Sequence, residues 1–226
     1  MTQEMIPLAV ADGEAQAYLA RPAQEGPGVL LLHAWWGLNP FFKSLCDRLA
    51  EAGFVALAPD LCQGRVATTI DEAEALQSNG DDALQEQTVA AAADYLLGLP
   101  GRSGGKIGVI GFSMGAWWSV NLALERPEEV GAVVLYYGAV PAPYTDYNKH
   151  SAAFLGHFGE LDEWEPLDTV REMEQAMHAA GREATIHVYP EVGHWFVEED
   201  RPDVYVPDAA EVSWERTIGF LREQLR

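Results

Sequence analysis

The chain has 226 residues, of which 48% are hydrophobic and 22% charged, as in a globular protein with a core and unlike a disordered or fibrous chain. Its 35 acidic residues against 14 Lys and Arg give a net charge of −21. This balance argues against nucleic acids and anionic membranes as partners, because phosphate binding needs a concentrated positive field. We expect a single domain over residues 1–226, as a monomer or a small homo-oligomer.

The two cysteines and the N-terminal sequence both favour a cytoplasmic location. Cys46 and Cys62 form neither a C-x-x-C pair nor a disulfide framework of the kind found in small secreted domains. The first residues, MTQEMIPLAVADGEAQ, lack a basic segment followed by an apolar stretch, so we expect no secretory signal. No window approaches the roughly 20 apolar residues that span a bilayer. These features predict a cytoplasmic protein without a membrane segment.

Apolar strands alternate with amphipathic helices along the chain. Two strands within residues 5–20 flank a turn at residues 11–13, and their alternating apolar residues indicate an antiparallel edge. The elements expected next are the strand GVLLLHAWWG, a helix at about 40–52, the strand FVALAPDL, one or two helices within 70–98 with a break near residues 78–80, the strand KIGVIGFS, a helix at about 114–126, the strands GAVVLYYG and AAFLGHFG, a helix at about 166–180, the strand ATIHVYP and a helix at about 208–225. This order predicts class α/β, with a mostly parallel, doubly wound sheet, helices on both faces and an antiparallel N-terminal edge.

The segment KIGVIGFSMGAWWSVNLAL contains the pattern G-x-S-x-G, with Ser113 between Gly111 and Gly115. It lies between an apolar strand and an apolar helix, the context in which such a serine is exposed on a sharp strand-to-helix turn. Ser113 is therefore the candidate nucleophile, and the backbone N–H of Met114, at the start of the helix, is the expected oxyanion donor. A glycine-rich turn that only needs small residues would give the same pattern. Neither a G-x-G-x-x-G fingerprint nor a phosphate loop occurs at this turn.

A serine hydroxyl needs a base to accept its proton, and histidine is the usual base because it titrates near neutrality. In α/β-hydrolases the chain order is serine, acid, histidine, and the histidine follows the last strand. His194 fits this order, because it lies between the strand ATIHVYP and the final helix. His157 competes for a place in the site but precedes the preferred acid. The other four histidines lie in strands, on a helix or before the acid's strand: His33, His150, His178 and His187.

The acid that orients His194 is expected directly after the strand AAFLGHFG, at the carboxyl edge of the sheet. Glu160, Asp162 and Glu163 all lie there. We expect Asp162, because the loop turns off the strand at this point and aspartate is the commoner orienting acid, with Glu160 as the main alternative. Asp60 comes too early in the chain and is expected to brace a loop.

Four segments together resemble the dienelactone hydrolase family of α/β-hydrolases. They are GVLLLHAWWGLNPFFKSLCDRLAEAGFVALAPDL, GFSMG, HFGELDEWEP and YPEVGHWFV, and they run over nearly the whole chain. The resemblance implies the α/β-hydrolase fold and a triad of Ser113, Asp162 and His194. It also implies a second oxyanion N–H in the loop after the first long strand, where Trp35 matches best.

Two features depart from the archetypal members of that family. Those enzymes use a cysteine nucleophile and a glutamate that helps control its ionisation, whereas this chain has Ser113 and, at the matching position, Ala34. They also hold the substrate carboxylate with arginines, one of them four residues after the histidine, where this chain has Glu198. Arg201 lies close in sequence and could substitute. The departures favour a neutral ester, or a substrate with an apolar acyl part, over the charged dienelactone.

Aromatic residues flank the candidate catalytic positions: Trp35, Trp36, Phe112, Trp117, Trp118 and Trp195. Most are expected in the core, because aromatic side chains bury large areas wherever they occur. The candidates for substrate binding are Trp35, Trp36, Trp195 and Phe112, with Trp35 and Trp195 foremost. A pocket lined in this way predicts small apolar or aromatic substrates.

The sequence therefore predicts a serine esterase or lactonase that forms an acyl-enzyme on Ser113 and acts on a small-molecule ester or lactone without a metal or organic cofactor. One alternative is a dienelactone (carboxymethylenebutenolide) hydrolase proper. Cleavage of an amide or a carbon–carbon bond by the same triad is another, because this fold hosts many reactions. A third, of another class, is a non-catalytic ligand-binding or regulatory module. The intact set of three triad residues weighs against that module.

Overall fold

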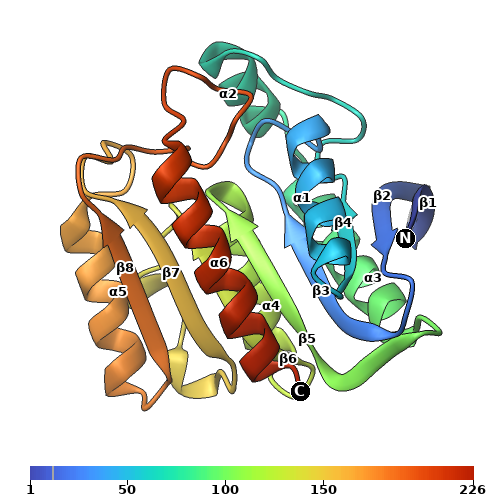
Figure 1. Cartoon of the computed structure of the whole chain (residues 1–226). Helices are drawn as coiled ribbons and strands as arrows, with labels where there is room; N and C mark the ends of the chain where they lie inside the picture. The colour runs from blue at the N-terminus through green and yellow to red at the C-terminus, as the bar shows by residue number, and fades with distance from the viewer. Residues whose placement is uncertain (12) are drawn as a thin grey trace. The chain divides into compact units, whose positions relative to one another are not determined.

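The computed structural model describes residues 1–11 and 13–226, and within them it contains eight strands and six α-helices (Figure 1). The chain divides into two compact units, Met1–Ile107 and Gly108–Arg226. Asp12, in the turn expected at residues 11–13, lies outside the described residues. The expectation of one domain over residues 1–226 stays a prediction.

The first unit combines an antiparallel edge with a parallel strand pair. Its elements are β1 (Thr2–Val10), β2 (Gly13–Arg21), β3 (Gly26–Leu32), α1 (Pro40–Glu51), β4 (Val55–Pro59), α2 (Ile70–Ser78) and α3 (Asp82–Gly98). The strands are hydrogen-bonded in the order β1-β2-β4-β3. The pairs β1·β2 and β2·β4 are antiparallel and β3·β4 is parallel, so the predicted N-terminal edge is confirmed.

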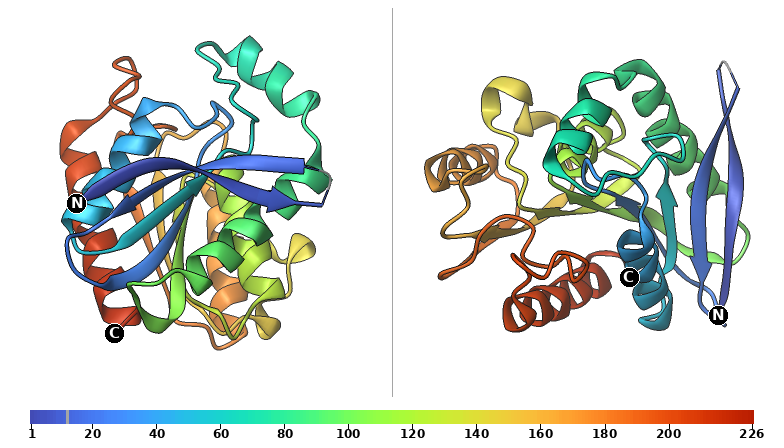
Figure 2. Two further views of the ribbon diagram at one scale, coloured as in Figure 1. Left: turned by 90° about the vertical axis from the view of Figure 1, so that its right-hand side faces the viewer. Right: turned by 90° about the horizontal axis from the view of Figure 1, so that it is seen from above.

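The helices of the first unit begin and end at local signals. The Asn39 side chain accepts a hydrogen bond from the backbone N–H of Phe42 and caps α1, and Gly53, at φ +98°, follows the end of that helix. The break expected near residues 78–80 separates α2 from α3, and Asp81 caps α3. Helices α1 and α3 cover opposite faces of the strands in this unit (Figure 2).

Buried polar side chains fix the loops after β3 and β4. Nε2 of His33 accepts a hydrogen bond from the Leu61 N–H at 3.0 Å. The Asp60 carboxylate accepts hydrogen bonds from the N–H groups of Cys62 and Gly64, at 3.0 and 2.6 Å, and so braces its loop as expected. Burial lowers the pKa of His33, which favours the neutral form that can accept a hydrogen bond.

The second unit is a parallel arrangement. It contains the last five residues of β5 (Arg102–Phe112), followed by α4 (Met114–Glu125), β6 (Val130–Tyr136), β7 (Ala153–Gly159), α5 (Leu167–Ala179), β8 (Ala184–Tyr189) and α6 (Pro207–Gln224), with 3₁₀ turns at Ala142–Tyr144 and Tyr147–Lys149. The strand order is β5-β6-β7-β8, and the pairs β6·β7 and β7·β8 are parallel. Strand β5 begins four residues before the predicted KIGVIGFS, because strand pairing outweighs the low strand propensity of the glycines there.

Helices cover both faces of the second unit's strands, with α4 and α5 on one face and α6 on the other (Figure 2). Tyr136 pairs with His157 in register, and Gly159 pairs with Tyr189. Because these strands are parallel, their carboxyl ends meet at one edge, where the loops after β5, β7 and β8 emerge. Among the described helices, none is both long and apolar enough to cross a bilayer.

Candidate active site

Ser113 lies on a sharp turn between β5 and α4. Its backbone has φ 49° and ψ −111°, a conformation uncommon for a non-glycine residue and found most often where the surroundings enforce it. A Cβ atom at Gly111 would lie 2.3 Å from both the Gly115 carbonyl oxygen and the Ser119 Oγ, so only glycine fits there. The Ser113 N–H donates to the Tyr136 carbonyl at 2.9 Å. The strand, turn and helix expected around the serine are therefore present.

A chain of hydrogen bonds joins Ser113 to a histidine and a carboxylate. Nε2 of His194 lies 3.1 Å from Oγ of Ser113, and Nδ1 of His194 lies 2.7 Å from Oδ2 of Asp162. Asp162 and His194 are buried, and Ser113 is partly exposed. The structure thus brings together the three side chains that the sequence indicated, in the order nucleophile, base and orienting acid.

Backbone contacts hold the acid loop against the histidine loop. The Leu161 N–H donates to the Val192 carbonyl at 2.8 Å, and the Glu160 N–H donates to the Tyr189 carbonyl at 2.9 Å. A Cβ atom at Gly159 would lie 2.3 Å from the Val192 carbonyl oxygen, so this approach requires glycine. The contacts place Asp162 opposite His194 although the two residues are 32 positions apart in the chain.

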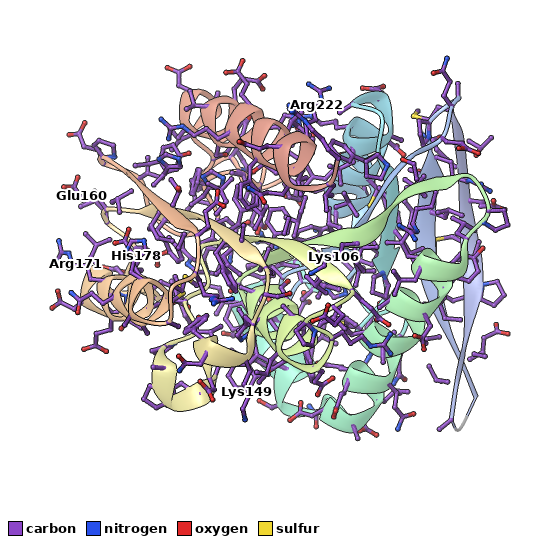
Figure 3. All side chains as sticks on the ribbon, turned by 90° about the horizontal axis from the view of Figure 1, so that it is seen from below. Lys106, Lys149, Glu160, Arg171, His178 and Arg222 are labelled. Atoms are coloured by element: carbon purple, nitrogen blue, oxygen red, sulfur yellow. The ribbon has the colours of Figure 1, made fainter. Side chains whose placement is uncertain are left out.

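The Asp162 carboxylate has further hydrogen-bond partners besides His194. Oδ1, the second oxygen of the single Asp162 carboxylate, accepts from the N–H groups of Trp164 and Glu165, at 2.8 and 3.0 Å. The alternative acid, Glu160, is exposed and accepts from the Glu191 N–H at 3.0 Å, and it lies at the periphery of the second unit (Figure 3). Glu163 is exposed as well. Of the three candidate acids, Asp162 is the one whose carboxylate bonds His194.

His157, the competing histidine, is enclosed in a network of hydroxyl groups. Its Nδ1 lies 2.9 Å from the Tyr189 hydroxyl, and its Nε2 lies 3.1 Å from Oγ1 of Thr217. The Thr217 hydroxyl is 2.8 Å from that of Tyr136, and Arg216 donates to the Tyr189 hydroxyl at 3.1 Å. Burial, with the charges of His187 and Arg216, holds the pKa of His157 well below its ordinary value. His157 therefore serves as a packed, neutral residue.

Other histidines lie on outer elements. His178 is an exposed residue of α5 whose Nε2 lies 3.1 Å from the Ala184 carbonyl oxygen (Figure 3). His187, on β8, is half-buried and stacks on His157 with ring centroids 5.8 Å apart. His150 is buried beside the Thr145 hydroxyl at 3.0 Å. None of these three bonds Ser113 or Asp162 in the described part of the chain.

Glu198, where the resemblance implies an arginine in archetypal enzymes, is a fully buried carboxyl. The Tyr137 hydroxyl donates to its Oε1 at 2.8 Å, and Nε of Arg201 donates to its Oε2 at 3.0 Å. Burial raises the pKa of Glu198 to about 8, against the opposing effects of Tyr137 and Arg201. The Tyr137 ring lies 4.8 Å from the His194 ring, so this pair supports the histidine from within the core. No local pattern in the sequence indicates the Tyr137–Glu198 contact.

Glu165 is a second carboxyl near the triad. Burial raises its pKa to about 7, the Ala139 N–H lowers it by a hydrogen bond, and the nearby charge of Asp162 raises it. Glu165 follows Trp164 in the acid loop. The loop therefore carries a group that titrates near neutrality beside the orienting acid.

The aromatic residues divide into core residues and exposed ones. Trp36 and Phe112 are buried, and Phe112 stacks on Tyr136 with centroids 4.7 Å apart; their expected role in substrate binding stays a prediction. Trp35 and Trp195 are each 8% exposed, and their expected role stays a prediction. Trp117 and Trp164 are exposed. Trp164 is not one of the substrate-binding residues expected from the sequence, because no local sequence pattern distinguishes an exposed tryptophan from a buried one.

The expected oxyanion donors lie in different units. Met114 is the first residue of α4, so its N–H belongs to the helix-terminal amides that have no partner within the helix. Trp35 lies in the first unit, in a tight turn closed by a hydrogen bond from the Gly37 N–H to the Ala34 carbonyl at 3.2 Å. The oxyanion roles of Met114 and Trp35 stay predictions. No cluster of three or more His, Cys, Asp or Glu side chains able to hold a metal occurs within residues 1–11 and 13–226.

Comparison with known proteins agrees with this fold and with the resemblance. Residues 15–225 match the model of the dienelactone hydrolase family. "Protein usf" of Aquifex pyrophilus is 33% identical, over 94% of this chain and 94% of that protein. The protein named "Putative carboxymethylenebutenolidase" in Aquifex aeolicus is 29% identical, over 94% of this chain and 95% of its own length.

A solved structure extends the similarity to the fold. The dienelactone hydrolase from Anabaena variabilis superposes with a TM-score of 0.72 at 22% identity, covering 100% of this chain and 99% of its own. The predicted α/β-hydrolase fold is thereby confirmed, as is the resemblance stated from the sequence segments. The chain is a hydrolase that belongs to the dienelactone hydrolase family.

Proposed function

We propose that this protein is a serine hydrolase that cleaves small carboxylic esters or lactones through an acyl-enzyme on Ser113. The observation that carries the proposal is the hydrogen-bond chain from Ser113 Oγ to His194 Nε2 at 3.1 Å, and from His194 Nδ1 to Asp162 Oδ2 at 2.7 Å. These distances allow the histidine to take the serine proton while the aspartate holds the ring in one tautomer.

The first step forms the acyl-enzyme. His194 accepts the Ser113 proton at Nε2 as Oγ attacks the substrate carbonyl, and Asp162 stabilises the resulting imidazolium through Nδ1–H. The tetrahedral intermediate places a negative charge on the former carbonyl oxygen. We assign its stabilisation to the N–H groups of Met114 and Trp35. As the intermediate collapses, His194 returns its proton to the leaving alcohol oxygen and the ester C–O bond breaks.

The second step hydrolyses the acyl-enzyme. A water molecule loses a proton to Nε2 of His194 and attacks the acyl carbon, and the collapse of the second intermediate returns that proton to Ser113 Oγ. The acid product leaves and the enzyme is restored. The scheme needs no metal or organic cofactor.

The surroundings of Glu198 favour a substrate that is neutral. A carboxyl occupies the position where the resemblance implies an arginine that holds an anionic substrate, and Arg201, the cation close to it in sequence, bonds that carboxyl at 3.0 Å. To bind a substrate carboxylate, Arg201 would have to give up this buried contact. Small esters or lactones with apolar or aromatic groups therefore fit the site better than the charged dienelactone.

Two other functions remain as alternatives. The family and the name of the Aquifex aeolicus relative favour a carboxymethylenebutenolidase, which would require that an anionic lactone be accepted despite Glu198. A ligand-binding module without turnover is the alternative from another class. The hydrogen-bonded Ser113, His194 and Asp162 argue against it, because a binding module has no need of that chain.

The proposal is tested by p-nitrophenyl acetate hydrolysis. We expect turnover by the native protein and a loss of about 10⁴-fold or more in kcat for Ser113→Ala, whose side chain lacks the nucleophilic oxygen. Ser119→Ala, in the same helix but bonded to the Gly115 carbonyl at 2.8 Å, is the matched control and keeps its activity. Activity that survives in Ser113→Ala would refute the assignment of the nucleophile, and a folded native protein without turnover would favour the binding module.

A further inference from the structure

Two tryptophan rings lie beside the ring of His194. Trp195 lies edge-on to the His194 ring, with centroids 4.7 Å apart and planes at 86°. Trp164 lies 6.3 Å from the same ring and 5.5 Å from Trp195. Trp164 is 47% exposed, so part of its ring surface is open to solvent. The two rings form an aromatic wall beside the catalytic base.

Each ring of this wall is held by the catalytic loops themselves. The backbone N–H of Trp164 donates to Oδ1 of Asp162 at 2.8 Å, the carboxylate whose other oxygen bonds His194. Trp195 follows His194 directly and has φ +59°, a strained conformation for a bulky residue. Its carbonyl accepts from the Glu198 N–H at 2.9 Å, which closes the turn. The wall therefore has a fixed position relative to the proton that His194 transfers.

The direction of proton transfer determines which part of a substrate meets this wall. When the tetrahedral intermediate collapses, Nε2 of His194 donates a proton to the leaving oxygen, which must then lie within hydrogen-bond reach of that nitrogen. The group attached to the leaving oxygen extends from the same point. A planar group there can lie against Trp164, whereas the acyl group stays on Ser113.

We propose that Trp164 and Trp195 form the subsite for the leaving alcohol, and that this subsite selects alcohols with an aromatic ring. The proposal rests on the function proposed above and adds to it the side of the substrate that is recognised and the residues that recognise it. Aromatic pairs in contact are stabilised beyond the burial of area, which gives an aromatic alcohol an advantage over a saturated ring of similar size.

The other exposed aromatic pair of the second unit provides a matched control. Trp117 and Tyr144 have ring centroids 6.1 Å apart, and Tyr144 is 63% exposed. Tyr144 follows β6, and its ring partner is a residue of α4 and not His194. Removal of its ring therefore tests whether any exposed aromatic residue has the same effect.

The experiment compares benzyl acetate with cyclohexylmethyl acetate, which share the acyl group and differ in the aromaticity of the alcohol. The native protein should prefer the benzyl ester in kcat/KM, and Trp164→Ala should lower that preference by about twofold to tenfold. Trp164→Phe should retain most of it, and Tyr144→Ala all of it. Tyr144→Ala, which changes an exposed ring outside the subsite, should also leave kcat for p-nitrophenyl acetate unchanged.

Three outcomes would overturn the subsite. The first is an equal loss of kcat/KM for both esters in Trp164→Ala, which would indicate a structural role. The second is an unchanged preference in that variant, and the third is the same loss in Tyr144→Ala. Failure of the proposed function has a different signature, because the native protein would then hydrolyse neither ester or Ser113→Ala would hydrolyse both.

Discussion

Two buried histidines of the second unit, His194 and His157, have opposite surroundings. His194 bonds a carboxylate on one side and the partly exposed Ser113 on the other. His157 bonds only hydroxyl groups, those of Tyr189 and Thr217, and has no exposed surface. Burial lowers the pKa of His157 well below its ordinary value. A buried histidine is therefore suited to act as a base when a carboxylate stabilises its charged form and a reacting group has access to it.

The hydrogen bonds around His157 also explain why it is inert. Arg216 can only donate to the Tyr189 hydroxyl, which leaves the proton of that hydroxyl available for Nδ1 of His157. The Nε2–H of His157 then donates to Thr217. In this arrangement the neutral ring satisfies its partners, and a second proton on Nδ1 would displace the hydrogen bond from the Tyr189 hydroxyl.

The largest effect is expected from removal of the base. His194→Gln should lower kcat/KM for p-nitrophenyl acetate by about 10⁴-fold to 10⁶-fold, because no other group can take the Ser113 proton. His157→Gln should change kcat/KM little per folded molecule. Steady-state kinetics on the two variants, with the folded fraction measured by circular dichroism, check the comparison. A comparable loss in His157→Gln would show that both histidines take part in the reaction.

Smaller losses of kcat are expected when the two carboxyls near His194, those of Asp162 and Glu198, are replaced by amides. Asp162→Asn should lower kcat by about 10³-fold to 10⁴-fold, because the amide no longer stabilises the imidazolium and favours the wrong tautomer. Glu198→Gln, which keeps an acceptor for Tyr137, should alter kcat by about threefold at most. Glu160→Gln is the control for the alternative acid. The assignment of Asp162 fails if Glu160→Gln is the more damaging substitution in the same assay.

The third effect concerns stability and its dependence on pH. His157→Leu should lower the free energy of unfolding by about 2 kcal/mol at pH 7.5, because it leaves the Tyr189 and Thr217 hydroxyls without a partner. The native pKa of His157 lies below the unfolded value near 6.5, so the unfolded state binds the proton first and stability falls as pH decreases below about 6.5.

Urea unfolding at pH 7.5, 6.5 and 5.5 measures that dependence. His33 and His150 have pKa values lowered by burial too, so they add to the acid loss in both proteins. The decrease in the free energy of unfolding between pH 7.5 and 5.5 should be smaller in His157→Leu than in the native protein, and the difference is the contribution of His157. Parallel curves for the native protein and the variant would contradict the neutral network.

Local patterns predicted the features that neighbouring residues determine. The turn at Ser113 follows from glycines two positions away on either side, and the loops of Asp162 and His194 follow from the strands that precede them. The parallel order and the antiparallel edge follow from the alternation of strands and helices. Chain order, and not geometry, separated His194 from His157.

Other features depend on contacts between distant segments and left no local signal. The Tyr137 hydroxyl meets Glu198 across 61 positions of the chain, and His157 meets Thr217 across 60. The exposure of Trp164 and the burial of Trp36 depend on tertiary packing, which no local sequence pattern indicates. Local patterns therefore predict the three triad residues, but they do not predict the Tyr137–Glu198 pair or the position of Trp164 beside His194.

Labelling with a fluorophosphonate tests the central claim most directly, because the reagent reacts with a serine that a neighbouring base has activated. We expect one adduct per chain by intact mass, located on Ser113 by peptide mapping, and no adduct in Ser113→Ala or His194→Gln. A folded native protein that stays unlabelled, or an adduct on another residue, would refute Ser113 as the nucleophile.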